Sequence, residues 1–514
     1  MASLTFKNSL KQYQDSGFFH NLEINRGIER ESLRVSNAGA ISQADHPKKL
    51  GSPLTNKDIT TDFAEALIEL VTPTFSSAEG LFDHLSDLHH FLYSTMGDEL
   101  LWNFSMPCAF NAESEIRIAE YGSSNSGMLK HVYRKGLRLR YGSIMQCVSG
   151  IHFNFSISKN SWLAMNPHPS QAFIDDQYLG LIRNVKRNFW FLLEHFGASP
   201  VAHKSYLLDR AHNLEQYGEE DLFLASATSL RMSNVGYQSA IQDTLDIRYN
   251  DLNEFINSVV KGINTPCEKF EALGLKDEQG MPQQISAGIL QIENELYDII
   301  RPKRTGASTS RPSNLLRRHG IEYIELRGVD VNPFIPEGIS TNHIKLLDVF
   351  LMHALISDSP IISEQEAIEI QFNHSAMVER GRDKDVSLSK EGALFTLADV
   401  KKNFYEELRM VAKAMDAYSS EYSVAIDDEL TKQDPPSRRI MSEMKEHEMS
   451  FQEYGLWQSQ KIAETYRNGA TRDFSHFIAS ADQSIKELEN LAKSTSADIN
   501  KYVELYNSKL KEEL

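Results

Sequence analysis

The chain has 514 residues, and 71 acidic residues against 53 Lys and Arg give it a formal net charge of -18. Such a charge repels phosphates except at local basic patches, so a general nucleic-acid surface is not expected. Three scattered cysteines without metal-ligand spacing favour a reducing cytosol, and no apolar run is long enough to cross a membrane, so we expect a cytoplasmic protein with no membrane partner.

The first predicted strand covers residues 27–35, GIERESLRV. Because side chains along a strand alternate between two faces, Glu29 and Glu31 share a face with Leu33 and Val35 and continue an apolar stripe. A buried carboxylate without a partner carries a large desolvation cost or takes up a proton. The two acids therefore indicate a cation over this face.

The second predicted strand covers residues 66–72, ALIELVT, where Glu69 again interrupts an apolar row. Asp62 lies just upstream and is a further candidate for the same cation. Glu65 is a weaker candidate, because its helical spacing from Asp62 would let it face water.

Apolar residues at three- and four-residue steps predict helices over 80–96, 178–196 and 396–417. Residues 151–157, IHFNFSI, alternate instead like a half-buried strand, with His152, Asn154 and Ser156 on the polar face. His152 can supply a nitrogen ligand, although a single buried histidine is more often a core residue.

Residues 303–314, KRTGASTSRPSN, are rich in Gly, Ser, Thr and Pro and are predicted to form a mobile loop. We expect the loop to order over a bound nucleotide, with Lys303, Arg304 or Arg311 near phosphate, and an ordinary solvent loop is an equal alternative. From about residue 480 the chain is amphipathic and charged, which is typical of one or two packing helices.

The predicted strand at 321–330, IEYIELRGVD, places Tyr323, Glu325 and Arg327 on one face. Glu325 can hold a metal while Arg327 contacts a phosphoryl group beside it. Strands and helices are interleaved along the chain without an internal repeat, which predicts a single α+β catalytic domain over residues 1–514.

Acids on several strands, together with one histidine, form the candidate metal site. Each acid alone is more often exposed or salt-bridged, but their number favours a hard divalent cation, Mg²⁺ or Mn²⁺. The candidate ligands are Glu29, Glu31, Asp62, Glu69, His152 and Glu325. The usual phosphate-binding motifs, such as GxxxxGK[ST] and GxGxxG, are absent from the sequence. If ATP binds, metals and arginines must hold its phosphates.

The segments GIERESLRV, TTDFAEALIELVTP, MQCVSGIHFNFS, ATSLRMSNVGY, LQIENELYDIIRPKR and GIEYIELRGVDVNPF resemble the glutamate–cysteine ligases of the proteobacterial, monofunctional type. The resemblance runs in order from about residue 20 to about residue 410 and is looser beyond that. It implies a glutamine-synthetase-like fold, in which a curved antiparallel sheet forms a funnel surrounded by helices. It also implies ATP as co-substrate and the first step of glutathione biosynthesis.

The resemblance assigns the same metal ligands as the pattern and adds catalytic roles for Arg327 and Glu325. It further implies that the amino-acid substrates contact Tyr133, Arg134, Gln146, Asn154, Arg231, Tyr237 and Tyr297. From the residues alone, Arg231 suits either a carboxylate clamp or a structural ion pair. Tyr133 and Tyr297 would be interpreted as core or surface aromatics.

The function expected from sequence is ATP-dependent ligation of the γ-carboxylate of L-glutamate to the amine of L-cysteine through γ-glutamyl phosphate. One alternative is a related carboxylate–amine ligase with a different amine acceptor. The other is a non-catalytic metal-binding homologue. We expect a monomer that binds no nucleic acid.

Overall fold

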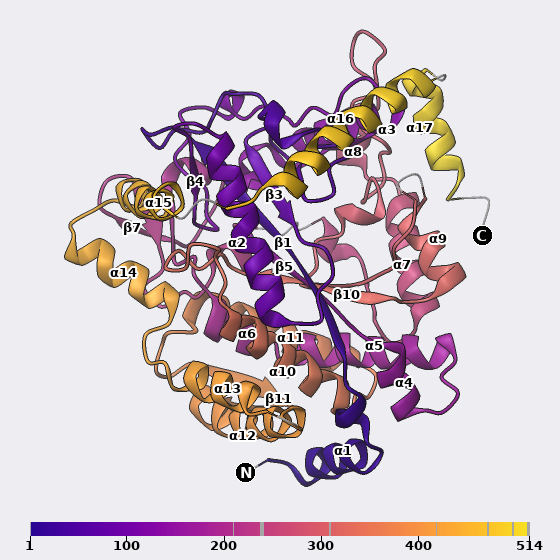
Figure 1. The fold of residues 1–514 in the computed structure, drawn as a ribbon, viewed down its shortest axis with the longest axis vertical. Coiled ribbons are helices and arrows are strands. Elements are labelled where there is room, and N and C mark those ends of the chain that lie inside the picture. The colour runs from indigo at the N-terminus through magenta and orange to yellow at the C-terminus, as the bar shows by residue number, and fades with distance from the viewer. Residues whose placement is uncertain are drawn as a thin grey trace.

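The computed structural model describes residues 2–208, 210–236, 241–307, 310–417, 419–469, 472–495 and 498–510. At its centre lies a seven-stranded antiparallel sheet with the order β2-β3-β1-β5-β10-β9, and β4 pairs with β1 (Figure 1). Its strands are β1 (Ile24–Val35), β2 (Ile59–Thr61), β3 (Leu67–Val71), β4 (Leu100–Trp102), β5 (Ile151–Ile157), β9 (Ile300–Lys303) and β10 (Tyr323–Val329). The smaller sheets contain β6 (Val201–His203), β7 (Glu215–Tyr217) and β8 (Asp221–Phe223), and β11 (Ser387–Lys390) with β12 (Ala393–Thr396).

The helices of the described residues fall along the whole chain. They are α1 (Leu4–Asp15), α2 (Ala78–Thr95), α3 (Asn125–Tyr141), α4 (Lys159–Met165), α5 (Gln171–Arg187), α6 (Phe189–Phe196), α7 (Leu252–Asn264), α8 (Glu268–Ala272), α9 (Pro312–His319), α10 (Thr341–Ile356), α11 (Glu364–Arg380), α12 (Leu397–Met415), α13 (Glu421–Thr431), α14 (Pro436–Glu446), α15 (Phe451–Arg467), α16 (Ser475–Ser494) and α17 (Ile499–Ser508). The α+β class predicted from sequence is therefore confirmed.

One face of the central sheet is apolar and lies under helices. The register places Phe153 of β5 between Ile28 of β1 and Leu326 of β10, and all three side chains are fully buried. Helix α2 packs against β1, while α5 packs against β9 and β10. Helix α10 packs against α5, α12 and α13, and this group lies at the end of the molecule opposite to α16 and α17 (Figure 1).

The apolar stripe predicted for the acids' face of β1 is present only at its end, where Leu33 and Val35 are fully buried. The opposite face is also covered, and it carries Arg26 as well as Ile28. The Arg26 guanidinium is only 3% exposed and pairs with Asp348 of α10 at 2.9 Å. An alternating strand pattern does not predict that an arginine is buried against a partner on a helix. The sequence therefore did not reveal that β1 is buried on both sides.

Most predicted elements match the structure. The helices predicted at 80–96 and 396–417 correspond to α2 and α12, and the stretch after residue 480 lies in α16 and α17. The prediction of one continuous helix over 178–196 is wrong, because α5 ends and α6 begins around Asn188, whose backbone is not helical. Among the described residues, no helix is both long and apolar enough to span a membrane.

Asp221 of β8 provides a pH-dependent contribution to stability. It is 1% exposed, and one carboxylate oxygen accepts a hydrogen bond from the Phe451 amide at the start of α15 at 2.7 Å. Its other oxygen is buried without a hydrogen-bond partner. Burial raises the pKa of Asp221 to about 6, against 3.8 for an ordinary Asp, and the hydrogen bond offsets only part of this rise.

Because the folded-state pKa of Asp221 is raised, its contribution to stability is complete below the unfolded pKa and is lost as the pH rises through about 6. We expect Asp221→Asn to gain about 1 kcal/mol relative to the parent when the pH rises from near 5 to near 7.5. Thermal melts at both pH values measure this gain. Glu219→Gln, at an exposed residue nearby, is the matched control. An equal Asp221→Asn effect at both pH values would contradict the assignment.

Candidate active site

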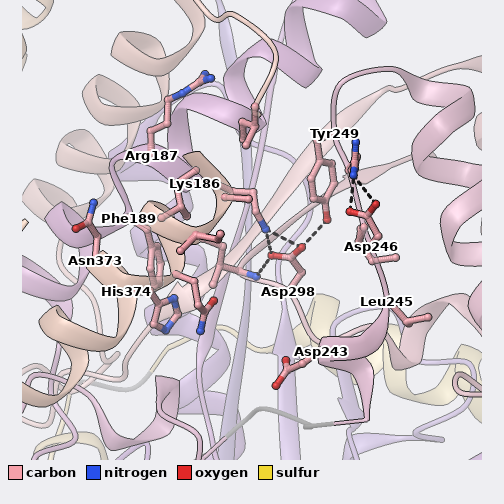
Figure 2. A pocket seen from close by; sticks show the side chains of 18 of the residues that line it. Lys186, Arg187, Phe189, Asp243, Leu245, Asp246, Tyr249, Asp298, Asn373 and His374 are labelled. Carbon is pink, nitrogen blue, oxygen red and sulfur yellow. Dashed lines mark hydrogen bonds and ion pairs between the residues drawn. The ribbon is translucent and has the colours of Figure 1, made fainter. Parts of the chain in front are cut away.

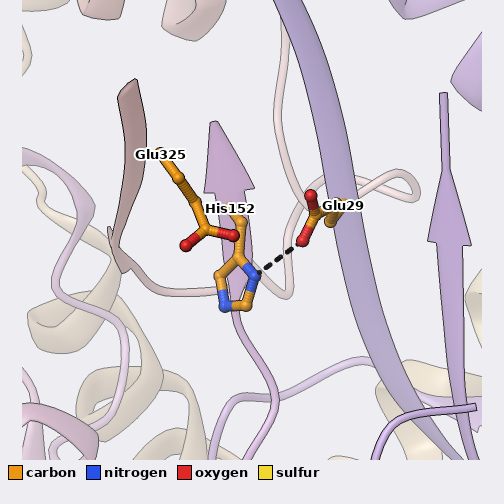
Figure 3. A group of neighbouring side chains, drawn as sticks. All are labelled: Glu29, His152 and Glu325. Atoms are coloured by element: carbon orange, nitrogen blue, oxygen red, sulfur yellow. Dashed lines mark hydrogen bonds and ion pairs between the residues drawn. The ribbon is translucent and has the colours of Figure 1, made fainter. Parts of the chain in front are cut away.

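Acids from three strands and a histidine from a fourth meet on the face of the sheet opposite to Phe153. We call this the acid face and define it by Glu29 and Glu31 of β1, Glu69 of β3, His152 of β5 and Glu325 of β10. The register explains the convergence, because Glu29 lies opposite His152 and Glu31 lies opposite Glu69. Figure 3 shows the carboxylates of Glu29 and Glu325 on either side of the His152 ring.

Two groups on the acid face have the geometry of a metal site. Ligand atoms of Glu29, His152 and Glu325 lie within 4.8 Å of one another, and those of Glu31, Glu69 and His152 do so as well. The shared residue is His152. Its Nδ1 lies 3.1 Å from Glu29 Oε2 and its Nε2 lies 3.7 Å from Glu31 Oε1.

Polar neighbours fix the two acids of β1. Asn154 Nδ2 donates to Glu29 Oε1 at 2.9 Å, and the Gly150 amide donates to Glu31 Oε2 at 2.8 Å. These bonds orient both carboxylates toward the space above the sheet. Asn154 Oδ1 is buried without a hydrogen-bond partner and therefore has an acceptor position available for a ligand.

Charge is unevenly distributed over the acid face. Burial raises the pKa of Glu31, and burial together with neighbouring carboxylates, including Glu29, raises that of Glu69 well above its usual range. Burial also opposes ionisation of Glu325, but Lys303 and Arg327 outweigh it and hold the Glu325 pKa well below its usual range. Around Glu31 and Glu69, burial and neighbouring carboxylates therefore outweigh the nearby cations, and a bound divalent cation would favour the ionised forms of both acids.

Cations surround Glu325. Lys303 Nζ lies 3.1 Å from Glu325 Oε1, and Arg327 Nη1 lies 3.2 Å from Glu325 Oε2. Arg327 Nη1 also lies 3.4 Å from His152 Nδ1, so the guanidinium borders one of the two candidate metal groups. The sequence prediction that Glu325 and Arg327 share a face is confirmed.

The remaining acidic candidates lie apart from these groups. Asp62 belongs to neither three-residue group, although its charge is close enough to contribute to the raised pKa values of Glu31 and Glu69. Glu65 does not face water as expected. It is 5% exposed and accepts hydrogen bonds from the His46 and Glu120 amides, both at 2.9 Å, so its role is structural.

Two predicted substrate residues lie together at the edge of the site. Gln146 Nε2 donates to the Tyr297 hydroxyl at 3.0 Å. The Tyr297 amide in turn donates to Gln242 Oε1 at 2.9 Å, which fixes the backbone that carries the phenol. Gln242 had no recognisable signal in the sequence, because the contact depends on a fold that brings residues 55 positions apart together.

Arg134 and Tyr133 lie on α3. The Arg134 side chain contacts the Asp62 carbonyl, donates to the Lys130 carbonyl at 3.1 Å and stacks over the Tyr121 ring at 4.7 Å. The Tyr133 carbonyl accepts a hydrogen bond from Gln291 Nε2 at 3.2 Å. Arg134 is therefore tied to the segment that carries Asp62.

Arg231 is buried behind the acid face. Its Nη1 lies 3.4 Å from Asp330 Oδ1, and its Nη2 donates to the Arg327 carbonyl at 3.0 Å. A Cβ atom on Gly150 would lie 2.0 Å from Nη2, so only glycine fits between Arg231 and Glu31. The structural ion pair considered for Arg231 is thus present. Tyr237, the remaining substrate residue predicted from sequence, lies outside the described residues.

Regular elements reach both ends of the segment 303–314, which was predicted to be a loop. Lys303 ends β9, and Pro312 begins α9. Arg311, one of three alternatives predicted to lie near phosphate, is 1% exposed, pairs with Glu293 at 2.9 Å and stacks over Tyr506, which favours a structural role. Residues 308 and 309 lie outside the described residues, and closure over a nucleotide stays a prediction.

A cavity of about 650 Å³ lies beside the acid face, since Tyr297 and Arg327, the partner of Glu325, contribute to its wall. Figure 2 shows Lys186 and Tyr249 converging on Asp298 within it. Lys186 Nζ lies 2.8 Å from Asp298 Oδ1, and the Tyr249 hydroxyl donates to Asp298 Oδ2 at 2.8 Å. The cavity offers a small molecule a route to Arg327.

Carboxylates and an imidazole beside an arginine and a lysine suit an enzyme that transfers phosphoryl groups with a divalent metal. The comparisons with known proteins specify the class. The family model described as glutamate-cysteine ligase matches residues 8–377. The chain belongs to the glutamate–cysteine ligase family, as the sequence motifs predicted.

Individual relatives agree with this assignment. A glutamate–cysteine ligase of Pseudomonas putida is 39% identical over 497 residues, covering 94% of this chain and 94% of the relative. One from Hahella chejuensis is 39% identical over 505 residues, covering 94% of this chain and 95% of the relative.

Solved structures show the same fold. The glutamate–cysteine ligase of Francisella tularensis in complex with AMP superposes with a TM-score of 0.90 at 33% identity, covering 96% of this chain and 99% of that one. A bifunctional glutathione synthetase of Pasteurella multocida gives a TM-score of 0.68 at 23% identity, covering 96% of this chain and 59% of that one. The second likeness concerns the fold alone.

Proposed function

We propose that the protein joins the γ-carboxylate of L-glutamate to the amine of L-cysteine and converts ATP to ADP and phosphate, the first step of glutathione biosynthesis. The observation that carries this proposal is the pair of carboxylate–imidazole groups sharing His152 and bordered by Arg327. They occur in a chain whose relatives carry the name glutamate–cysteine ligase over nearly its full length. The AMP bound in the Francisella tularensis enzyme supports ATP as the co-substrate.

The reaction proceeds in two steps, a phosphoryl transfer and the formation of an amide. A γ-carboxylate oxygen of glutamate attacks the γ-phosphorus of ATP, and the bond between this phosphorus and the oxygen that bridges to the β-phosphate breaks. ADP departs and γ-glutamyl phosphate remains. The amine of cysteine then attacks the acyl carbon, phosphate leaves, and the amine loses a proton as the amide forms. Arg327 stabilises negative charge on the oxygens of the transferred group.

The acid face fits a divalent cation. Glu29, His152 and Glu325 would hold one ion, and Glu31 and Glu69 would complete a second group with His152. The raised pKa values of Glu31 and Glu69 support this assignment, because buried acids so close together require added positive charge. We assign Mg²⁺ or Mn²⁺ on donor chemistry, with Asp62 as a further ligand. When bound, the metal reduces the repulsion between the glutamate carboxylate and the triphosphate.

We assign the amino-acid substrates to the edge of the site where Gln146 and Tyr297 are in contact. Asn154 Oδ1, which has no hydrogen-bond partner, can accept from a substrate ammonium group. The remaining substrate contacts proposed from the family are Tyr133, Arg134, Arg231 and Tyr237. We further propose that the sheet forms a glutamine-synthetase-like funnel and that residues 1–514 act as one catalytic domain.

Measurement of ADP formation by the purified protein tests this function. ADP should form only when ATP, Mg²⁺, glutamate and cysteine are all present, and γ-glutamylcysteine should appear in equal amount. A panel of other amines distinguishes a ligase with a different acceptor. ADP formation that is independent of both amino acids, or no turnover at all, would contradict the proposal and favour the non-catalytic alternative.

A further inference from the structure

Arg301 is a buried cation on the acid face that the sequence did not reveal. It lies on β9, at the edge of the sheet, directly opposite Glu325 of β10. Directly opposed residues of an antiparallel pair point to the same face, so Arg301 belongs to the face that carries the candidate metal ligands. The residue is only 7% exposed.

Two nitrogens of the Arg301 guanidinium lack hydrogen-bond partners among the described residues. Its Nε and Nη2 are buried without a hydrogen bond, and no ion pair of Arg301 occurs within the part of the chain that the structure describes. The charge of Arg301 contributes to the lowered pKa of Glu325, but the two carboxylate oxygens of Glu325 contact Lys303 and Arg327 at 3.1 and 3.2 Å, and they accept no hydrogen bond from Arg301 Nε or Nη2. A buried guanidinium with unmade hydrogen bonds is costly, which indicates that an anion supplies the missing acceptors.

We propose that Arg301 binds a non-bridging oxygen of the ATP triphosphate, an inference that rests on the proposed ligase function. Lys303 shares its face two residues further along β9, so the edge strand presents two cations beside Arg327. Of the substrates, the triphosphate carries the highest density of negative charge and must lie next to Arg327 for phosphoryl transfer. A buried planar fork with two free N–H groups matches the oxygens of a phosphate.

Two substitutions test the role of Arg301. Arg301→Lys keeps the charge and loses the fork, whereas Arg301→Met removes both. We expect each variant to bind the β,γ-imido analogue of ATP with Mg²⁺ roughly 10- to 100-fold more weakly in calorimetry, as expected for lost hydrogen bonds to a charged group. The KM for glutamate should stay within about threefold of the parent, since the lost contacts are specific to the nucleotide.

The stability of the nucleotide-free protein separates binding from a structural role. Because Arg301 has no hydrogen bond to lose there, Arg301→Lys should melt within a few degrees of the parent, while its stabilisation by the ATP analogue should shrink. Arg409→Lys is the matched control, because Arg409 lies on α12, away from the acid face and the 303–314 segment, and pairs with Asp427. The control should bind nucleotide like the parent.

Three results would overturn the proposal: parent-like nucleotide affinity in both variants, weakened affinity for glutamate alone, or a large loss of stability with nucleotide binding unchanged. A failure of the ligase function is a separate result. It would appear as a parent protein that binds the ATP analogue but forms no ADP with glutamate and cysteine, and the nucleotide affinities of the variants would still decide the role of Arg301.

Discussion

Glu325→Gln is expected to lower kcat/KM for ligation by about 10³-fold while the protein remains folded. The substitution keeps the size of the side chain but removes a charge on which Lys303, Arg327 and the proposed metal converge. An amide also presents an N–H group to one of these cations, which adds repulsion to the lost attraction. Steady-state kinetics at saturating Mg²⁺ measures the effect, and melting curves establish that the variant is folded.

Glu322→Gln provides the matched control for Glu325→Gln. Glu322 lies three residues away, its side chain is 43% exposed, and it bonds to Thr305 rather than to the acid face. The control should retain activity within a few-fold of the parent and keep its stabilisation by Mg²⁺. If Glu325→Gln were active and stabilised by Mg²⁺ like the parent, Glu325 would not be a metal ligand.

Arg327→Lys is expected to lower kcat by about 10²-fold, as for the loss of one preorganised donor to a transition state. Lysine keeps the positive charge but cannot reach Glu325 and a phosphoryl oxygen at once with a planar fork. Because this contact strengthens as the phosphoryl group moves, the KM for glutamate should change much less than kcat.

Kinetics of Arg327→Lys beside Arg409→Lys measures that difference. Arg409 carries the same group on α12, outside the acid face, so its substitution should leave kcat nearly unchanged. A kcat for Arg327→Lys within a few-fold of the parent would mean that Arg327 only neutralises Glu325, and it would remove Arg327 from the residues that act on substrate.

The alternation of strands made much of the acid face predictable. Glu29, Glu31, Glu69, His152 and Glu325 each stand at a position whose parity places it on one face of its strand. The registers of β1, β3, β5 and β10 then bring these positions together. Register itself is set by long-range pairing, so the sequence alone could not show that His152 is shared between two groups.

Other features depended on contacts that no local pattern records. Asp62 and Glu65 are both acids just before the second predicted strand. Glu65 accepts hydrogen bonds from two backbone amides, whereas Asp62 lies near the acid face. Arg301 was not predicted from sequence because the segment after it resembles a loop. The register of the edge strand β9 places Arg301 opposite Glu325. Arg311 appeared to be a loop cation but is buried beside Glu293. In each case the role of the side chain depends on a neighbour that only the folded chain brings next to it.

We propose that the acid face transfers the γ-phosphoryl group of ATP to the γ-carboxylate of glutamate. Isotope transfer tests it most directly, with glutamate labelled with ¹⁸O in the γ-carboxylate, unlabelled ATP, cysteine and Mg²⁺. We expect each phosphate released to carry one oxygen from glutamate, because the bond broken by the amine lies between the acyl carbon and that oxygen. Phosphate without ¹⁸O, formed together with γ-glutamylcysteine, would contradict the acyl phosphate and the roles assigned here to Glu325 and Arg327.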